Sequence, residues 1–447
     1  MNTLSLLRAG QLAGSQRLDL SCGLKEFPVE IFDLADSLEI LNLSGNALSS
    51  LPDDLGRLHK LRVIFCSDNN FTEMPEVLGQ CQQLSMVGFK ANRIRQVPAT
   101  AFTSALTRSL RWLILTDNQV SLLPEELGLC THLQKLMLSG NRLEQLPEQM
   151  IGCTALELLR IAANRFTALP ECVFSLPRLA WLAYAGNPFS DSSEAIARQQ
   201  VDSKRNTINW HNLALQHKLG EGASGIIYQA TWQHEAVSKQ VAVKLFKGAL
   251  TSDGLPHSEM AACMSAGTHT NLIGVNGQIN NHPSGVAGLV MSLIDSRYRN
   301  LAEPPSLASC TRDIYPDEAK FNPGSVLRIA LGIASAARHL HAQGILHGDL
   351  YAHNILHNAF GDCLLGDFGA ASFFPQENQV QAHALQRIEV RAFACLLEEL
   401  LQRCLVPSES QDTVNAMLTL QARCAQSSSA ARPLFAEIEQ NLMALKL

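Results

Sequence analysis

Several features are missing from this sequence of 447 residues, and each absence excludes a class of protein. No two cysteines form a C-x-x-C pair, which argues against zinc ribbons and thioredoxin-like redox sites. No apolar run approaches the roughly 18–20 residues of a membrane span, and the N-terminus lacks a secretory-signal pattern. The net charge is only −6, whereas a nucleic-acid binder usually carries a basic face. We therefore expect a cytoplasmic protein that binds neither membranes nor nucleic acids.

The residues that are present favour packed domains. Hydrophobic residues make up 46% of the chain and charged residues 17%, which excludes global disorder. Twelve cysteines lie mostly in apolar or helical surroundings, where a reduced thiol packs as a small hydrophobic group. Aromatic residues are scarce at 6% while leucine is abundant, which is a first indication of a repeat architecture. At roughly 100–200 residues per domain, the length predicts two or three domains.

A leucine pattern repeats at a fixed spacing through the first half of the chain. The units follow L-x-x-L-x-L-x-x-N with mild substitutions such as Ile64 and Cys66, and an apolar-proline pair such as Leu51-Pro52 recurs downstream. One longer step, between Leu84 and Leu110, interrupts an otherwise constant period. With a degenerate unit around Leu18, the count is about eight units. The leucines that open the regular units are Leu38, Leu61, Leu84, Leu110, Leu133, Leu156 and Leu179.

This pattern resembles the leucine-rich repeat family over roughly residues 15–190. The alternation in L-x-L places two leucines on one face of a short strand, and stacked strands form a parallel sheet lining a curved solenoid. The recurrent asparagine falls at one depth in every unit, where its amide can bridge backbone groups of adjacent turns. We therefore expect these asparagines to be structural: Asn46, Asn69, Asn92, Asn118, Asn141, Asn164 and Asn187.

The outward strand positions are unusually apolar. Large exposed apolar patches usually mark partner surfaces. We expect one docking patch, for a partner protein or for the second half of the same chain, at Phe65, Trp112, Ile114, Met137 and Trp181. The alternative is that neighbours in the stack shield some of these side chains.

The periodicity ends after Asn187, and a different pattern follows. The predicted domains are an α/β solenoid over residues 1–190, a cap and linker over 191–209, and a second domain over 210–447. The second domain opens with a G-x-G-x-x-G motif, whose residues are Gly220, Glu221, Gly222, Ala223, Ser224 and Gly225. Dinucleotide-binding folds share this motif but continue with a helix, whereas Ile226-Ile227-Tyr228 reads as a strand.

Polar residues farther along decide between these folds. Lys244 ends the strand Val241-Ala242-Val243, and Glu259 follows on a helical stretch, placed to pair with it. His347-Gly348-Asp349-Leu350 with Asn354 gives H-x-D-L-x-x-x-N, and Asp367-Phe368-Gly369 comes next along the chain. In order and spacing these motifs resemble the protein-kinase family over residues 210–447. The resemblance implies an α+β bilobal fold and a serine/threonine kinase that uses ATP and Mg²⁺.

The resemblance also implies roles for individual residues. Lys244, oriented by Glu259, would hold the α- and β-phosphates, and Asp349 would accept the proton of the substrate hydroxyl. Asn354 and Asp367 would coordinate Mg²⁺ as hard oxygen ligands. The backbone that would cover the phosphates belongs to Gly220, Gly222, Ala223, Ser224 and Gly225. Residues 290–294 look like the interlobe hinge, where Met291 and Leu293 would contact the nucleotide.

The sequence departs from the family pattern at several points. Gly348 replaces the arginine that commonly gathers a phosphorylated activation loop, so we expect activity without phosphorylation of residues 370–388. Tyr351 stands where a lysine usually lies near the γ-phosphate, and Glu389 stands where aspartate is usual. Phe368 and Glu389 lie close together along the chain, and no Ala-Pro-Glu occurs, so the segment that would bind a peptide is short.

Two other functions stay open beside a protein kinase. Aminoglycoside and choline kinases share the loop of His347 to Asn354 and lack a long activation segment, which favours a small-molecule kinase. A pseudokinase that serves as a scaffold or binding module is the other alternative. The stretch Asp367-Phe368-Gly369-Ala370-Ala371-Ser372 favours the protein kinases.

Overall fold

The computed structural model describes residues 2–203, 207–222, 224–234, 237–248 and 250–445. They form two compact units, Met1–Leu179 and Ala180–Leu447, and each is described by itself. The predicted fold class is confirmed, because the first unit is a repeat solenoid and the second is an α+β bilobal domain. The domain boundaries at residues 190 and 210 stay a prediction. Within the described ranges, no helix has the length and apolarity needed to span a membrane.

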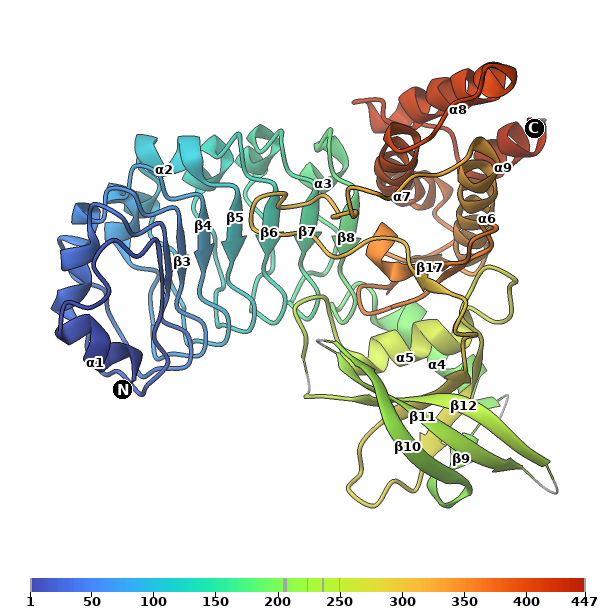
Figure 1. Ribbon diagram of the computed structural model, residues 1–447, viewed down its shortest axis with the longest axis horizontal. Coiled ribbons are helices and arrows are strands. Elements are labelled where there is room, and N and C mark those ends of the chain that lie inside the picture. The colour runs from blue at the N-terminus through green and yellow to red at the C-terminus, as the bar shows by residue number, and fades with distance from the viewer. Residues whose placement is uncertain (1, 204–206, 223, 235–236, 249, 446–447) are drawn as a thin grey trace. The chain divides into compact units, whose positions relative to one another are not determined.

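In the first unit each repeat contributes one three-residue strand to a parallel sheet (Figure 1). Neighbouring strands pair in register, so that Ile40 faces Val63 and Val63 faces Met86. The central residue of each strand is buried, as the L-x-L alternation predicts. The strands are β1 (Arg17–Asp19), β2 (Ile40–Asn42), β3 (Val63–Phe65), β4 (Met86–Gly88), β5 (Trp112–Ile114), β6 (Lys135–Met137) and β7 (Leu158–Arg160).

The return path of most repeats contains a short 3-10 helix. It begins directly after the proline of the apolar-proline pair, except after Pro52, where it begins at Leu55. Proline lacks an N–H and has its φ fixed, so it suits the extended position that precedes such a turn. The 3-10 helices are Val29–Leu34, Leu55–Arg57, Glu76–Gln80, Ala99–Ala101, Glu125–Leu129 and Glu148–Gly152. The α-helices are α1 (Thr3–Arg8), α2 (Ser104–Ser109) and α3 (Cys172–Ser175), and α2 takes up the one longer step of the repeat.

The asparagines form a ladder of hydrogen bonds between turns, which confirms their structural role. Asn141 is representative: its Nδ2 donates to Leu115 O at 2.8 Å and to Leu138 O at 2.9 Å. Its Oδ1 accepts the backbone N–H of Val120 at 2.9 Å. Each such amide satisfies backbone groups that would otherwise be buried without a partner.

The second unit opens with β8 (Trp181–Ala183) and α4 (Asp191–Ser203) and continues into a six-stranded sheet. The sheet has the order β10-β11-β12-β14-β13-β9, and α5 (Pro256–Ser265) packs against β13. Residues 191–209, interpreted as a cap and linker, thus contain a helix and an edge strand of this sheet. The strands are β9 (Thr207–Asn209), β10 (Leu213–Glu221), β11 (Gly225–His234), β12 (Val237–Phe246), β13 (Val275–Asn280) and β14 (Gly288–Ser292).

The helical lobe is built around α6 (Pro323–Ala342), whose residues are largely buried, and α7 (Gln379–Gln402). The remaining helices are α8 (Gln411–Cys424) and α9 (Phe435–Met443). Two small sheets carry the loops that matter below. They contain β15 (Arg299–Asn300), β17 (Ile355–His357) and β18 (Cys363–Leu365) in one, and β16 (Ile345–Leu346) and β19 (Ser372–Phe373) in the other.

Candidate active site

A buried ion pair joins the sheet to helix α5. Lys244 lies in the middle of the sheet, on β12 between Ile227 of β11 and Leu289 of β14. Its Nζ contacts Glu259 Oε1 and lies 4.0 Å from Asp367 Oδ1. Burial alone would lower the pKa of Lys244, but the two carboxylates outweigh it and the pKa is raised. Lys244 therefore stays charged near neutral pH.

Asp349 and Asn354 face each other across the loop that follows β16. Asn354 Nδ2 donates to Asp349 Oδ2 at 2.8 Å and to the Asp349 backbone oxygen at 2.9 Å. His347 Nε2 lies 2.9 Å from Gly366 O, and the Gly366 N–H donates to Asn354 O at 3.0 Å. These contacts bring the residue before Asp367 against the loop that carries Asp349, although β17 and β18 separate the two aspartates along the chain.

Helix α7 fixes the same loop through one side chain. Glu389 Oε1 accepts the backbone N–H of Gly348 at 2.7 Å, and Glu389 Oε2 lies 2.7 Å from His341 Nε2. In the sequence, Glu389 stands where the kinase pattern usually has aspartate. The longer side chain still reaches the backbone of the loop from His347 to Asn354, which we call the catalytic loop after its kinase counterpart.

Asp367 has a geometry suited to an oxygen ligand. Its φ is +53°, its side chain is about half exposed, and its Oδ1 accepts the Gly369 N–H at 3.2 Å. Asn354 donates its Nδ2 to Asp349, and its amide oxygen is of the ligand type that suits a hard cation. Over the part of the chain that the structure describes, no cluster of three His, Cys, Asp or Glu side chains could hold a metal alone.

The glycine-rich motif forms the turn between β10 and β11. The Gly222 N–H donates to Gly225 O at 2.9 Å. A Cβ on Gly225 would lie 2.5 Å from Leu245 O, so packing requires glycine there. A Cβ on Gly220 or Gly222 would meet nothing within 4 Å, so packing does not explain those two glycines. Ser224 is buried, and Ala223 lies outside the described residues.

A cavity of about 110 Å³ adjoins the ion pair. Of the predicted site residues it is lined by Lys244, Glu259, Met291 and Asp367, whereas Leu293 follows the end of β14 and is not part of the lining. The rest of the wall consists of Gly366 and apolar side chains that were not identified from the sequence, because such residues look like ordinary core: Ile227, Cys263, Ile273, Val275, Leu289 and Phe368.

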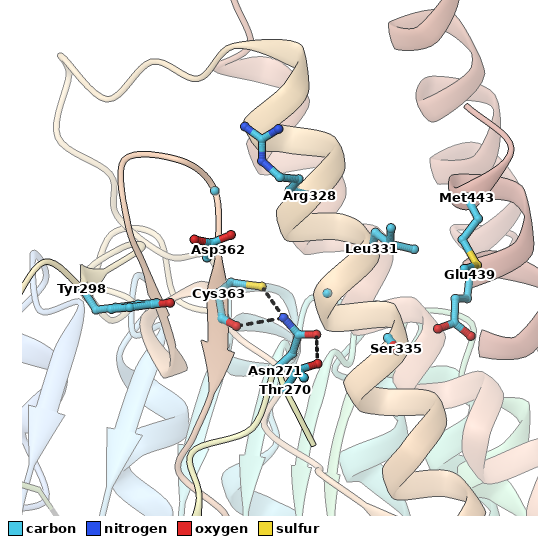
Figure 2. A pocket seen from close by; sticks show the side chains of 12 residues that line it. Thr270, Asn271, Tyr298, Arg328, Leu331, Ser335, Asp362, Cys363, Glu439 and Met443 are labelled. Atoms are coloured by element: carbon cyan, nitrogen blue, oxygen red, sulfur yellow. Dashed lines mark hydrogen bonds between the residues drawn. The ribbon is translucent and has the colours of Figure 1, made fainter. Parts of the chain in front are cut away.

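A larger cavity of about 480 Å³ lies beside α6, α9 and β18 (Figure 2). Its wall includes Asn271, Tyr298, Arg328 and Glu439, and Asn271 Nδ2 donates to Cys363 O at 3.0 Å within it. None of the predicted site residues lines it. The larger cavity therefore does not coincide with the predicted site residues.

A second polar pair supports the catalytic loop and was not predicted. His353 Nδ1 lies 2.7 Å from Asp313 Oδ1, and the His353 N–H donates to Asp313 Oδ2 at 3.0 Å. Burial alone would lower the pKa of His353, but Asp313 outweighs it and the pKa is raised. Asp313 lies 40 residues before His353, so no local sequence signal indicates this contact.

The predicted docking patch is divided by the structure. Phe65, Trp112, Ile114 and Met137 are half-buried on strands β3, β5 and β6 of the first unit. Trp181 belongs to the second unit and is only 1% exposed. Its ring stacks on Tyr351, in the second half of the chain, so it offers no exposed side chain to a partner protein. We call the remaining four residues the strand-face patch.

Comparisons with known families agree with this geometry. Residues 213–411 match the family model of protein tyrosine and serine/threonine kinases, and residues 37–58 match the leucine-rich repeat model. A kinase domain implies ATP and a divalent metal ion. Every predicted site residue in the second unit falls within the kinase match.

The similar curated proteins carry serine/threonine-kinase names. A Dictyostelium discoideum protein named "Probable serine/threonine-protein kinase gdt4" is 30% identical over 190 residues, which cover 41% of this chain and 10% of that protein. The chicken serine/threonine-protein kinase mos is 28% identical over 187 residues, covering 40% and 52%. The mos transforming protein of Moloney murine sarcoma virus is 28% identical over 179 residues, covering 37% and 44%. The chain thus spans about half or less of the length of these relatives.

Proposed function

We propose that this chain, which joins leucine-rich repeats to a protein kinase domain, transfers the γ-phosphate of ATP to serine or threonine hydroxyls of a protein. The observation that carries the proposal is the convergence of Lys244, Glu259 and Asp367 beside the Asp349–Asn354 pair. Phosphoryl transfer needs mainly positioning and neutralisation of charge, and this cluster supplies a fixed cation and oxygen ligands. The serine/threonine-kinase names of the relatives support the choice of acceptor.

In the proposed mechanism the buried ammonium of Lys244 binds the α- and β-phosphates, and Glu259 holds it in place. The Gly220 and Gly222 backbone covers the phosphates, which supplies the reason for glycine that packing does not. The chain would hold Mg²⁺ through Asp367 and the Asn354 amide oxygen, and Mg²⁺ when bound neutralises phosphate charge. Met291 and Leu293 are proposed to contact the adenine from the hinge.

Asp349 is proposed to orient the substrate hydroxyl and to accept its proton. The Asn354 amide holds one carboxylate oxygen at 2.8 Å, which fixes the orientation of the carboxylate. Tyr351 cannot offer the cation that lysine usually brings near the γ-phosphate, so Lys244 and the metal carry more of the charge.

The repeats are proposed to dock a protein partner through the strand-face patch. Trp112 joins the patch together: its ring meets Phe65 edge-on at 6.4 Å, and its Nε1 lies 3.3 Å from Met137 Sδ. Contiguous aromatic and methionine side chains are the usual anchors of a protein interface. The twelve cysteines are free thiols, which supports the proposed cytoplasmic location.

The test is incubation of the purified chain with Mg-ATP and a generic serine/threonine protein acceptor such as casein, read by intact mass. We expect mass steps of one phosphate on the acceptor, and Asp349→Asn should bind ATP but lose most transfer. A small-molecule kinase would instead phosphorylate a panel of aminoglycosides and choline and leave proteins unmodified. A pseudokinase would bind ATP and modify neither, which would overturn the proposal.

A further inference from the structure

The second unit begins before the kinase family match. Residues 180–203, comprising β8 and α4, precede the matched residues 213–411 yet belong to the same compact unit. We call them the N-terminal brace. Its side chains contact three elements of the proposed active site: the catalytic loop, the stretch after Asp367 and helix α5.

Trp181 holds the catalytic loop directly beyond Asp349. Its indole N–H donates to Leu350 O at 3.1 Å. Its ring stacks on Tyr351, with centroids 4.0 Å apart and planes 6° from parallel. A buried indole needs both an apolar neighbour and a hydrogen-bond acceptor, and this loop provides both. Tyr351, which departs from the usual lysine, is thus the packing partner of the brace.

Tyr184 holds the stretch that follows Asp367-Phe368-Gly369. Its backbone N–H donates to Ser372 Oγ at 3.0 Å, and its hydroxyl donates to Phe373 O at 3.3 Å. Ser372 is fully buried. The stretch that follows Gly369 is therefore anchored by side-chain and backbone contacts with Tyr184.

Gly348 makes room for the brace. Its φ is +73°, and a Cβ there would lie 2.7 Å from Leu182 O and 2.5 Å from Ala370 O. The arginine that the kinase family usually carries at this position would collide with β8 and with the activation segment. Glycine at position 348 therefore allows β8 to pack against this loop, which an arginine there would prevent.

Glu194 connects the brace to helix α5, beside which α4 lies (Figure 1). Its Oε1 accepts the Gly186 N–H at 2.7 Å and the Ser190 hydroxyl at 2.9 Å. Its Oε2 accepts the Ser258 hydroxyl at 2.8 Å. Ser258 directly precedes Glu259, so this contact fixes the turn of α5 from which Glu259 reaches Lys244.

We propose that the N-terminal brace is a working part of the kinase, with Trp181, Tyr184 and Glu194 as positioning residues for Asp349, the activation segment and Glu259. This inference rests on the proposed function and adds how the site is kept active. The brace takes the place of the phosphate-bound arginine, so full activity requires no phosphorylated activation segment.

The test compares full-length variants. Trp181→Ala removes the stack and the indole hydrogen bond, Trp181→Phe keeps an aromatic ring, and Glu194→Ala removes the link to Ser258. Ile196→Ala is the matched control, because Ile196 lies on the same helix with 57% of its surface exposed. Initial rates on casein give kcat and the KM for ATP, melting temperatures report the fold, and phosphatase-treated parent reports any need for phosphate.

We expect Trp181→Ala and Glu194→Ala to lower kcat about tenfold or more, because small misplacements of reacting groups are costly. Their KM for ATP should change far less, Trp181→Phe should recover most of the rate, and Ile196→Ala should match the parent. Phosphatase treatment should leave the parent's rate unchanged. Parent-like or raised kcat in both alanine variants, or a large loss after phosphatase treatment, would overturn the inference.

Hydrogen exchange separates this inference from the proposed function. Glu194→Ala should speed amide exchange in α5, and Trp181→Ala should speed it in residues 347–354, whether or not the parent transfers phosphate. If the parent is inactive but the variants show these exchange changes, the proposed function is refuted, whereas the positioning of α5 and residues 347–354 by the brace is supported. An active parent with unchanged exchange and rates in the variants refutes the brace alone.

Discussion

Lys244 is expected to affect both nucleotide binding and the stability of the fold. It is buried with Glu259, so removing its charge leaves a carboxylate in the interior without its cation. We predict that Lys244→Met lowers phosphoryl transfer by about 100-fold or more. It should also lower the free energy of unfolding by about 3 kcal/mol, since one partner of a buried pair is lost. Urea unfolding and initial rates measure the two effects.

The double variant Lys244→Met/Glu259→Gln is the control. It removes the unpaired carboxylate, so stability should return toward that of the parent while transfer stays lost. If the single variant transfers phosphate at the parent's rate, Lys244 does not bind the nucleotide.

Among elements, the asparagine ladder sets the spacing of the solenoid turns. Asn141→Ala removes two donated bonds and one accepted bond and leaves buried backbone groups unsatisfied. We predict a loss of about 2–3 kcal/mol in the free energy of unfolding. Arg142→Ala, at the exposed neighbour, should change it by less than about 0.5 kcal/mol. Equal stability of the two variants in urea unfolding would contradict the structural role of the ladder.

Helix α7 carries a carboxyl whose titration affects folding. Burial raises the pKa of Glu399 to about 7, with Tyr315 O–H donating to it at 3.2 Å and Arg312 Nη1 3.8 Å away. The folded state keeps its proton above the ordinary pKa near 4.5, so this group's contribution to stability falls as pH rises from about 4.5 through 7. We predict that Glu399→Gln raises stability at pH 8 by about 1–3 kcal/mol and leaves it nearly unchanged at pH 4.5. Melting temperatures across this range test it, and a pH-independent difference between parent and variant would contradict it.

At the scale of the whole molecule, we expect the repeats to bind the protein acceptor and the kinase domain to phosphorylate it. We predict that Trp112→Ala weakens capture of a protein acceptor while initial rates on a short serine/threonine peptide stay unchanged. Because Trp112 is half-buried, the stability cost should stay below the roughly 3–5 kcal/mol of a core aromatic truncation. Affinity capture with cross-linking, peptide kinetics and unfolding measure the three quantities.

The control for Trp112 is Leu122→Ala, at a leucine of the same unit that is 60% exposed and outside the strand-face patch. It should retain acceptor capture. If Trp112→Ala melts the solenoid, the indole is part of the core and the patch does not exist as a docking surface.

The sequence predicts the solenoid well because nearly the same residue spacing recurs in every repeat. A constant step from one repeat to the next forces equivalent positions into register, so the buried strand centres and the asparagine ladder follow from counting. The kinase-like residues are also predictable, because several motifs share one order. Lys244 and Asp367 come together only when segments far apart along the chain fold against each other. The sequence predicts this proximity only because the order of its motifs resembles that of the kinase family.

Other features could not be predicted, for physical reasons. Trp181 follows the same alternation as Trp112, and the sequence does not tell which outward face is covered. The polar character of residues 191–209 predicts a cap and linker, but α4 is held by the buried carboxylate of Glu194. Contacts between residues far apart along the chain, such as His353 with Asp313, leave no local pattern.

The cavity that Met291 helps to line has a consequence for inhibitor chemistry. Its volume of about 110 Å³ approaches that of engineered apolar cavities, of about 150 Å³, that accept benzene. Methionine is flexible and polarizable, so it can turn aside where a branched or aromatic side chain would block entry. A nucleotide-competitive compound bearing a small aromatic ring could place that ring beside Phe368 and Cys263. Burial raises the pKa of the Cys263 thiol well above its ordinary value, so the thiol is a poor nucleophile. Such a compound should therefore gain affinity from the fit of its ring and not from a covalent bond to Cys263.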